Sequence, residues 1–197
     1  MYLVIDTETT GLPDWRIPAD AEGQPRLASW CFIFADWDCN PVHEWHGLVR
    51  PDGWTMPPDV AAINGLTNER LQADGFPIAW PLSLFAMALH AGCTPVAHNL
   101  AFDMKIMRGE LRRGGYRKEA DLSDRVGLCT MRELTARCAL PSPKKPGAFK
   151  FPRLVEACEI ILKEKLEGAH DAVNDARACL RLLGSIRKPA MPQALPS

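Results

Sequence analysis

Several features that would assign a protein class are missing from this sequence of 197 residues. No apolar run is long enough for a membrane-spanning helix, and the first residues contain neither the basic nor the long apolar region of a secretory signal. The formal net charge is only -1 at pH 7, which excludes a strong overall attraction to a polyanion. We therefore expect a cytoplasmic protein without membrane contacts, whose contacts with nucleic acid, if any, are local.

The seven cysteines do not match the common functional uses of this residue. They are odd in number, lie far apart and include no Cys-x-x-Cys pair. Such pairs are typical of zinc sites, and even numbers of cysteines are typical of small disulfide-linked secreted domains. The sequence therefore indicates reduced thiols in the core of an intracellular protein. It contains no internal repeat, and its length matches one compact domain.

The order of apolar patterns predicts a single α/β domain over residues 1–187. Three β-rich segments come first and are followed by alternating helices and strands, which favours one mixed sheet flanked by helices. Strands are expected at 2–5, 29–37, 42–49, 94–97 and about 126–129, and helices at 57–64, 81–91, 100–113, 131–138, 153–163 and 171–183. Segments 13–27 and 141–150 are predicted loops, and 188–197 is expected to be a disordered tail.

The first predicted strand leads directly into two acids, Asp6 and Glu8. The period of two in a strand places both side chains on one side, where buried acids are rare unless positive charge meets them. A solvated acidic turn after the strand is the alternative interpretation of this short pattern. The pair is therefore a candidate site only if other residues join it.

Two further acids lie on predicted helices beside apolar residues. Asp175 falls within the apolar arc of helix 171–183, where a lone carboxylate is costly without a cation or hydrogen bonds. Asp103 lies on the apolar side of helix 100–113, but Glu110 shares that side, so a solvated helix flank is the alternative. Both acids are candidate metal ligands.

Two histidines lie close to these acids in the sequence. His170 directly precedes the helix that carries Asp175, and it could either act in catalysis or cap that helix. His98 follows the predicted strand 94–97 and is interpreted as structural or substrate-positioning.

Three motifs bring these residues into one pattern: Asp6-Thr7-Glu8-Thr9-Thr10-Gly11, His98-Asn99-Leu100-Ala101-Phe102-Asp103 and His170-Asp171-Ala172-Val173-Asn174-Asp175-Ala176. In this order they resemble the DEDDh family of 3′→5′ exonucleases, which includes the proofreading subunit of bacterial replicative DNA polymerase and oligoribonuclease. The histidine five residues before the last aspartate distinguishes this branch from relatives with a tyrosine four residues before it. Segment 58–67 also resembles the family, although Asn64 stands where many members have histidine.

The resemblance implies a ribonuclease-H-like fold with a central mixed five-stranded sheet flanked by helices. It also implies that two Mg²⁺ or Mn²⁺ ions are bound by four acids, Asp6, Glu8, Asp103 and Asp175. His170 would be the general base, because histidine exchanges a proton near neutral pH. The reaction would hydrolyse phosphodiester bonds at a 3′ end and release nucleoside 5′-monophosphates.

Substrate contacts are also implied by the resemblance. The candidates are main-chain groups around Thr7 and Thr9, Leu12 as an apolar wedge, and Phe102 beneath the sugar, together with Asn64, His98 and Asn99. Phe102 has core spacing, so a core role is the alternative. Two basic clusters could contact phosphates or could be solvated faces: Lys105, Arg108, Arg112, Arg113, Arg117 and Lys118 form one, and Lys144, Lys145 and Lys150 form the other.

Three functions are compatible with these motifs. The favoured one is an exonuclease acting on the 3′ end of single-stranded or frayed DNA, in proofreading or repair; the second is an RNA-directed exonuclease of the same family. The third is a non-catalytic subunit that binds a polymerase or nucleic acid, against which the presence of all four acids and the histidine argues. The C-terminal residues contain no aromatic clamp-binding peptide, so the sequence does not support a replication partner.

Overall fold

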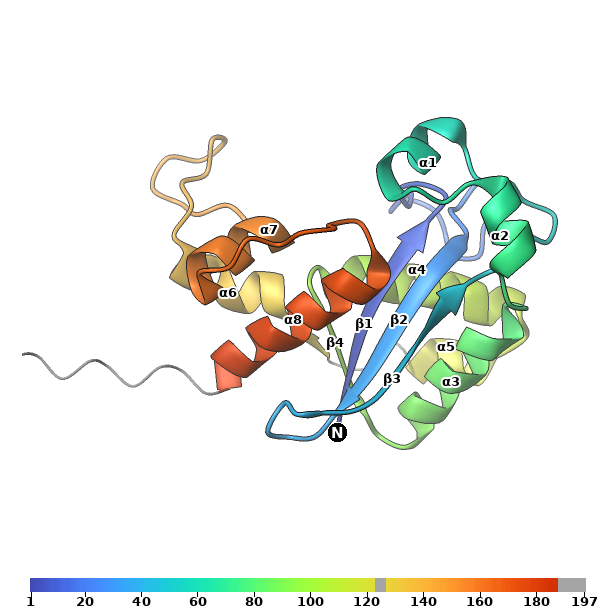
Figure 1. The fold of residues 1–197 in the computed structure, drawn as a ribbon, viewed down its shortest axis with the longest axis horizontal. Coiled ribbons are helices and arrows are strands. Elements are labelled where there is room, and N and C mark those ends of the chain that lie inside the picture. Colours follow the sequence, from blue (N-terminus) through green and yellow to red (C-terminus); the bar gives the residue numbers. More distant parts are fainter. Residues whose placement is uncertain (123–126, 188–197) are drawn as a thin grey trace, which may run out of the picture.

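The computed structural model describes residues 1–122 and 127–187, which form a five-stranded mixed sheet with helices on both faces (Figure 1). The strand order is β3-β2-β1-β4-β5, where β1 pairs antiparallel with β2 and parallel with β4. The strands are β1 (Tyr2–Thr9), β2 (Leu27–Ala35), β3 (Pro41–Leu48), β4 (Thr94–Ala97) and β5 (Leu128–Cys129). The predicted fold, a mixed five-stranded sheet that begins with an antiparallel meander, is confirmed.

Eight α-helices and one π-helical turn lie within the described ranges. They are α1 (Pro58–Asn64), α2 (Asn68–Asp74), α3 (Ala79–His90), α4 (Leu100–Arg113), α5 (Arg117–Leu122), α6 (Thr130–Cys138), α7 (Leu154–Ala157), the π-turn η1 (Cys158–Leu162) and α8 (Ala172–Arg187). None of these helices combines the length and apolar composition needed to cross a membrane. Helices α2 and α5 were not predicted, and the predicted tail at 188–197 lies outside the described residues.

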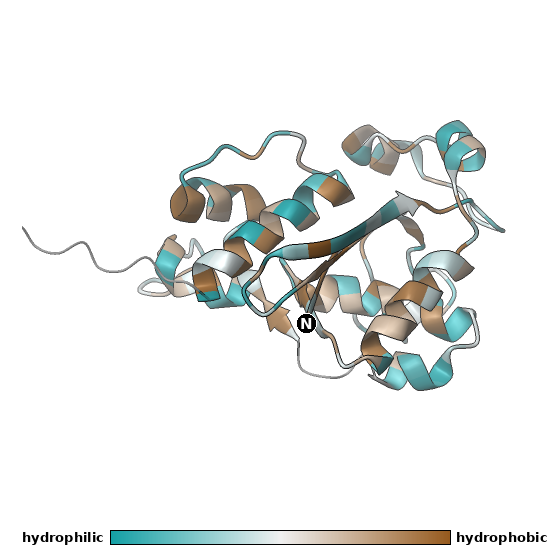
Figure 2. Ribbon diagram, turned by 60° about the horizontal axis from the view of Figure 1, so that its bottom comes forward, coloured by the Kyte–Doolittle hydropathy of each residue, from teal (hydrophilic) through white to brown (hydrophobic). Residues whose placement is uncertain are grey.

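Alternate residues of β1 face the two helical layers. Tyr2 and Val4 pack against α8 residues such as Ala176, while Leu3 and Ile5 pack on the opposite face with residues of α3 and α4. Hydrophilic and hydrophobic residues alternate along α8, as expected for a helix with one side on the sheet (Figure 2). Because the period continues along the strand, Asp6 and Glu8 extend the side that faces α8.

Strand β1 is longer than predicted. The prediction ended it at Ile5, but antiparallel pairing with β2 continues, and Asp6 pairs with Cys31 and Glu8 with Ser29. Backbone hydrogen bonding to a central neighbour therefore holds the two acids in extended conformation. The alternative of a solvated acidic turn is wrong.

The loop between β1 and β2 is ordered by one buried amide. The Gln24 side chain is 6% exposed, and its Nε2 atom lies 2.7 Å from the Asp14 carbonyl and 3.0 Å from the Pro18 carbonyl. Its Oε1 atom accepts a hydrogen bond from the Asp14 N–H. The loop also lies directly on α4, since a Cβ at Gly109 would be only 2.4 Å from the Ala19 carbonyl oxygen. Only glycine permits this close approach.

Cations on α4 hold the same loop. Lys105 Nζ donates to the Ile17 carbonyl over 2.7 Å, Arg113 donates to the Ala19 carbonyl, and Arg112 forms an ion pair with Asp20. This part of the predicted basic cluster is therefore engaged within the protein. These three cations fix the loop that follows the motif Asp6–Gly11.

Glu110, which shares a helix side with Asp103, is also a structural residue. Its side chain is 2% exposed, and its carboxylate accepts hydrogen bonds from Arg26 Nε (2.8 Å) and the Leu27 N–H (3.2 Å), with Arg113 as a second ion-pair partner. A buried charge with two cationic partners and a backbone donor is satisfied. The two acids on α4 thus differ, because Glu110 has a full set of partners and Asp103 does not.

Candidate active site

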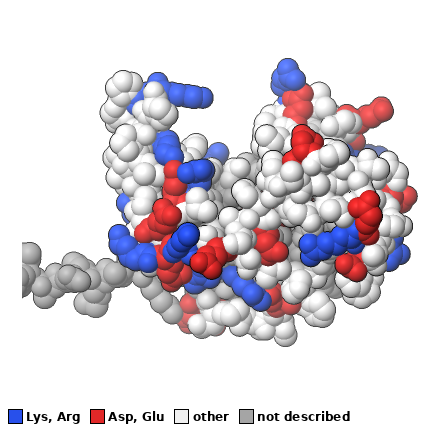
Figure 3. Space-filling model, turned by 45° about the horizontal axis from the view of Figure 1, so that its top comes forward, with Lys and Arg blue, Asp and Glu red and all other residues white. Residues whose placement is uncertain are grey.

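All four predicted acids line one cleft, of about 520 Å³. Asp6 and Glu8 come from the end of β1, Asp103 from the first turn of α4 and Asp175 from the first turn of α8. The cleft is bounded by α1 on one side and by residues 151–154 on the other. Figure 3 shows the surface hollowed between two projecting parts of the molecule.

Thr7 of β1 holds the carboxylate of Asp103 on α4 by a hydrogen bond. The Thr7 hydroxyl donates a hydrogen bond to Asp103 Oδ1 over 2.8 Å, and both residues are buried, at 6% and 3% exposed. Burial raises the pKa of Asp103 to about 7, although the bond from Thr7 acts in the opposite direction. Thr7 was predicted to contact the substrate through its main chain. In the structure its side chain orients Asp103.

Asp6 and Glu8 lie in an acidic surrounding. Burial raises the pKa of Asp6 well above its ordinary value, and the charges of Asp103 and Asp175 raise it further. Burial and the charge of Asp175 likewise raise the pKa of Glu8 to about 7, against a hydrogen bond from Asn64. No lysine or arginine in the described ranges forms an ion pair with any of the four acids. Among the described residues, the charge of His170 opposes this repulsion, since it lowers the pKa of Asp175.

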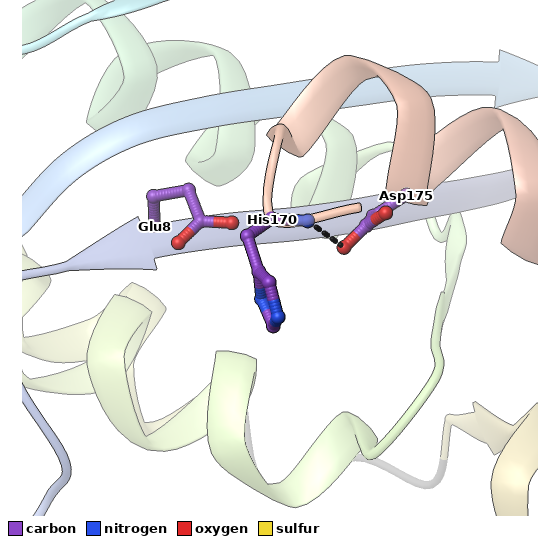
Figure 4. Close-up of side chains that lie close together, drawn as sticks. All are labelled: Glu8, His170 and Asp175. Carbon is purple, nitrogen blue, oxygen red and sulfur yellow. Dashed lines mark hydrogen bonds between the residues drawn. The ribbon is translucent and has the colours of Figure 1, made fainter. Parts of the chain in front are cut away.

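Asp175 and His170 form the outer part of the site. The His170 N–H donates to Asp175 Oδ2 over 3.2 Å, whereas Asp175 Oδ1 is buried and has no hydrogen-bond partner among the described residues. Burial raises the pKa of Asp175 to about 6, although this bond lowers it. Ligand atoms of Glu8, His170 and Asp175 all lie within 4.8 Å of one another. The His170 ring lies between the two carboxylates and points away from α8 (Figure 4).

Asp171, not His170, caps helix α8. Its Oδ1 atom accepts hydrogen bonds from the N–H groups of Val173 (3.1 Å) and Asn174 (3.0 Å), which satisfies two otherwise unpaired donors of the first turn. His170 has a left-handed backbone, with φ of 68°, and an exposed side chain. The alternative that His170 is the helix cap is wrong, and its imidazole is available to the cleft.

The donor set fits a hard divalent cation. Carboxylate oxygens are the ligands that Mg²⁺ and Mn²⁺ prefer, and four carboxylates converge here without an ion pair to any lysine or arginine in the described part of the chain. The pKa values of these acids are raised, and Asp175 Oδ1 is buried without a hydrogen-bond partner among the described residues, so their ionised forms are destabilised in the cleft. A bound cation would stabilise the ionised carboxylates and give Asp175 Oδ1 a partner.

The predicted substrate-binding residues line the same cleft: Thr7, Thr9, Leu12, Asn64, His98, Asn99 and Phe102. Leu12 is 87% exposed at the mouth, while Phe102 both lines the cleft and packs against the core below it. His98 Nε2 lies 3.0 Å from the Pro152 carbonyl, and its Nδ1 lies 3.0 Å from the Thr130 hydroxyl, so it connects three segments. Their roles toward a substrate stay predictions.

Several residues that line the cleft were not predicted, among them one from α1 and two from the segment before α7. Ile63 extends from α1, and Phe151 and Arg153 belong to the segment before α7. Phe151 follows a segment that was predicted only as a loop, where nothing in the sequence indicates which side chains turn toward the acids. The sequence shows only that Phe151 is an aromatic residue directly before a proline.

A family model described as an exonuclease, of the RNase T type, matches residues 3–183. The chain belongs to this family of DEDDh 3′→5′ exonucleases. The predicted family and enzyme class are confirmed, and divalent metals are typical cofactors of the family. A search of curated protein sequences gives no match.

Solved structures of exonuclease I show the same fold. The E. coli enzyme in complex with a dT13 oligonucleotide has 21% sequence identity and a TM-score of 0.73, covering 95% of this chain and 41% of that one. A zinc-bound complex of the E. coli enzyme with single-stranded DNA has 20% sequence identity and a TM-score of 0.75, and the match covers 96% of this chain and 41% of that one. Exonuclease I from Methylocaldum szegediense has 21% identity and a TM-score of 0.70, and the match covers 94% of this chain and 40% of that one. The chain thus spans about two fifths of the length of these enzymes.

Proposed function

We propose that this exonuclease removes nucleotides from the 3′ end of single-stranded or frayed DNA and releases nucleoside 5′-monophosphates. The observation that carries the proposal is the convergence of Asp6, Glu8, Asp103, Asp175 and His170 in one cleft. The dT13 oligonucleotide bound by the similar E. coli enzyme supports DNA as the substrate. Proofreading or repair in the cytoplasm is the use that we propose for this activity.

The acids would divide between two Mg²⁺ or Mn²⁺ ions. Glu8 and Asp175, whose oxygens lie within 4.8 Å of each other, would bind one ion together with Asp6. Asp6 would also reach the second ion, which Asp103 supports. When bound, such ions neutralise phosphate charge and make a water molecule more acidic. Thr7 keeps Asp103 oriented for this task through the bond to Oδ1.

His170 would accept the proton of the attacking water at an unprotonated ring nitrogen. Its ring lies between the Glu8 and Asp175 carboxylates, which would hold it beside the reacting phosphate (Figure 4). Two backbone features fix its position, namely the bond from its N–H to Asp175 and the capped helix that follows directly. After proton transfer, the neighbouring carboxylates would stabilise the imidazolium.

The apolar mouth of the cleft suits an unpaired strand. Leu12 is 87% exposed and Ile63 is 65% exposed, and both line the cleft that holds the acids. Base faces are available to such side chains only where the strand is not stacked in a duplex. We therefore propose that paired ends are hydrolysed after fraying.

The test uses end-labelled DNA and RNA oligonucleotides of matched sequence with Mg²⁺, Mn²⁺ or EDTA. We expect shortening of DNA from the 3′ end, slower cleavage of RNA, and no cleavage in EDTA. The Asp175→Asn protein, purified in the same way, controls for contaminating nucleases. Faster cleavage of RNA than of DNA would overturn the proposed substrate and leave the nuclease assignment intact.

A further inference from the structure

A third large apolar side chain stands at the mouth of the cleft. Phe151 is 56% exposed and lines the same cleft as Leu12 and Ile63. It belongs to the segment that precedes α7, whereas Leu12 follows β1 and Ile63 lies on α1. Exposed apolar side chains that gather around a polar site are typical of a binding surface. The exposed ring of Phe151 therefore favours a ligand that has an apolar face.

The backbone on both sides of Phe151 is anchored. His98 Nε2 donates to the Pro152 carbonyl over 3.0 Å, which leaves Nδ1 to accept from the Thr130 hydroxyl. The Arg153 N–H donates to the Glu156 carboxylate over 2.8 Å, and on the other side of Phe151 the Lys150 N–H donates to the Leu140 carbonyl over 2.9 Å. The ring is thus presented by a fixed backbone, which reduces the entropy that a ligand contact must overcome.

We infer that Phe151 stacks on an unpaired base of the substrate strand and so helps to select single-stranded 3′ ends. This inference rests on the proposed function. Aromatic side chains stack on any base, because every base has a π-face, and such contacts strengthen binding of single strands. A base inside a duplex already uses both faces for stacking and cannot accept the ring.

The same loop provides a matched control. Phe149 is 51% exposed, two residues away, and is not among the residues that line the cleft. Its backbone pairs with Pro141 across the loop, so it shares the local fold of Phe151. Loss of a phenyl ring at either position should therefore disturb folding equally, and only Phe151 should affect the nucleic acid.

The experiment measures the Kd of a single-stranded DNA oligonucleotide that contains 2-aminopurine, in EDTA so that no turnover occurs. We expect Phe151→Ala to weaken binding on the order of 10- to 100-fold and to reduce quenching of the 2-aminopurine fluorescence. Phe151→Trp should bind within a few-fold of wild type, and Phe151→Leu should resemble Phe151→Ala, because it keeps apolar size without the aromatic face. Phe149→Ala should bind like wild type.

Equal Kd values for Phe151→Ala and Phe149→Ala would overturn the inference, as would full binding by Phe151→Leu. Thermal melts of all variants verify that each is folded. Hydrolysis of the p-nitrophenyl ester of thymidine 5′-monophosphate with Mn²⁺ tests the catalytic proposal separately. Absence of ester hydrolysis by the wild-type protein would count against the proposed function, whereas the Kd comparison decides the role of Phe151.

Discussion

The backbone N–H of His170 donates a hydrogen bond to Asp175 Oδ2 over 3.2 Å, although the two residues are separated by a full helical turn. His170 has a left-handed backbone, with φ of 68°, just before the start of α8. Asp171 then caps the helix through the N–H groups of Val173 and Asn174. Adjacent residues thus serve different purposes, because His170 faces the cleft and Asp171 stabilises α8.

Replacement of His170 should impair turnover and leave stability nearly unchanged. Asparagine is the suitable substitute, since it tolerates a left-handed backbone and cannot act as the base. We expect His170→Asn to lower kcat about 10²- to 10⁴-fold, the usual contribution of a positioned proton acceptor. Single-turnover kinetics on a labelled oligonucleotide would measure it.

The matched control is Asp171→Ala in the same helix start. Because this change removes the cap, it should lower the free energy of unfolding by about 0.5–2 kcal/mol, measured by urea denaturation. A His170→Asn protein with wild-type kcat, or with the larger loss of stability of the two, would contradict this division of tasks.

Removing the charge of either buried acid on α4 should change the stability of the protein in opposite directions. Glu110→Ala leaves Arg26 and Arg113 without their partner, so we expect a loss of stability on the order of 3–5 kcal/mol. Asp103→Asn should instead abolish turnover and leave stability equal or higher, because Asp103 has no cationic partner in the described residues. Urea denaturation and the nuclease assay on both proteins check this. Loss of stability in Asp103→Asn would show that Asp103 is structural.

Much of this fold was predictable because periodicity reports burial. The meander and helices α3, α4 and α8 have long apolar patterns, and their predicted positions agree with the structure to within a few residues. Strand β1 was predicted too short, since Asp6 and Glu8 interrupt the apolar run while pairing with β2 continues. Helices α2 and α5 are short and owe their stability to tertiary contacts, which a single sequence does not show.

Some residues of the site could likewise be predicted from the sequence, and others could not. Asp175 was identifiable because it interrupts an apolar helix face, and the three motifs added the remaining acids. The difference between Asp103 and Glu110 was not predictable, because it depends on Arg26, which is distant in sequence and close only in the fold. Phe151 was missed for a similar reason, since its direction depends on the contact between His98 and Pro152.

A divalent cation should raise the melting temperature of the wild-type protein. A ligand that binds only the folded state stabilises it by mass action, and here it also relieves repulsion among the four acids. Titration of Mn²⁺ in a thermal melt would measure the effect. In Asp6→Asn the metal-free protein should melt at a higher temperature than wild type, and the gain from Mn²⁺ should shrink. Equal gains in the two proteins would place the ion elsewhere.

The metal-free protein should lose stability as pH rises from about 4 to about 7. The folded-state pKa values of Glu8 and Asp103 are about 7 and that of Asp175 about 6, while ordinary carboxyl groups in an unfolded chain titrate near 4. Within this window the folded state holds more protons than the unfolded state, so a rise in pH favours unfolding.

Other carboxylates do not mask this trend. The pKa of Glu156, for example, is lowered to about 2 by Lys150, so its stabilising effect is fully present above pH 5 and constant from there on. Urea midpoints in EDTA between pH 5 and pH 8 should therefore fall for wild type, and should fall less for Asp103→Asn, which has one such acid fewer. Addition of Mg²⁺ at pH 8 should restore the midpoint of wild type. The burial of His98, which lowers its pKa, acts in the opposite direction but involves one group against several acids. A midpoint that rises from pH 5 to pH 7 in EDTA would therefore contradict the prediction.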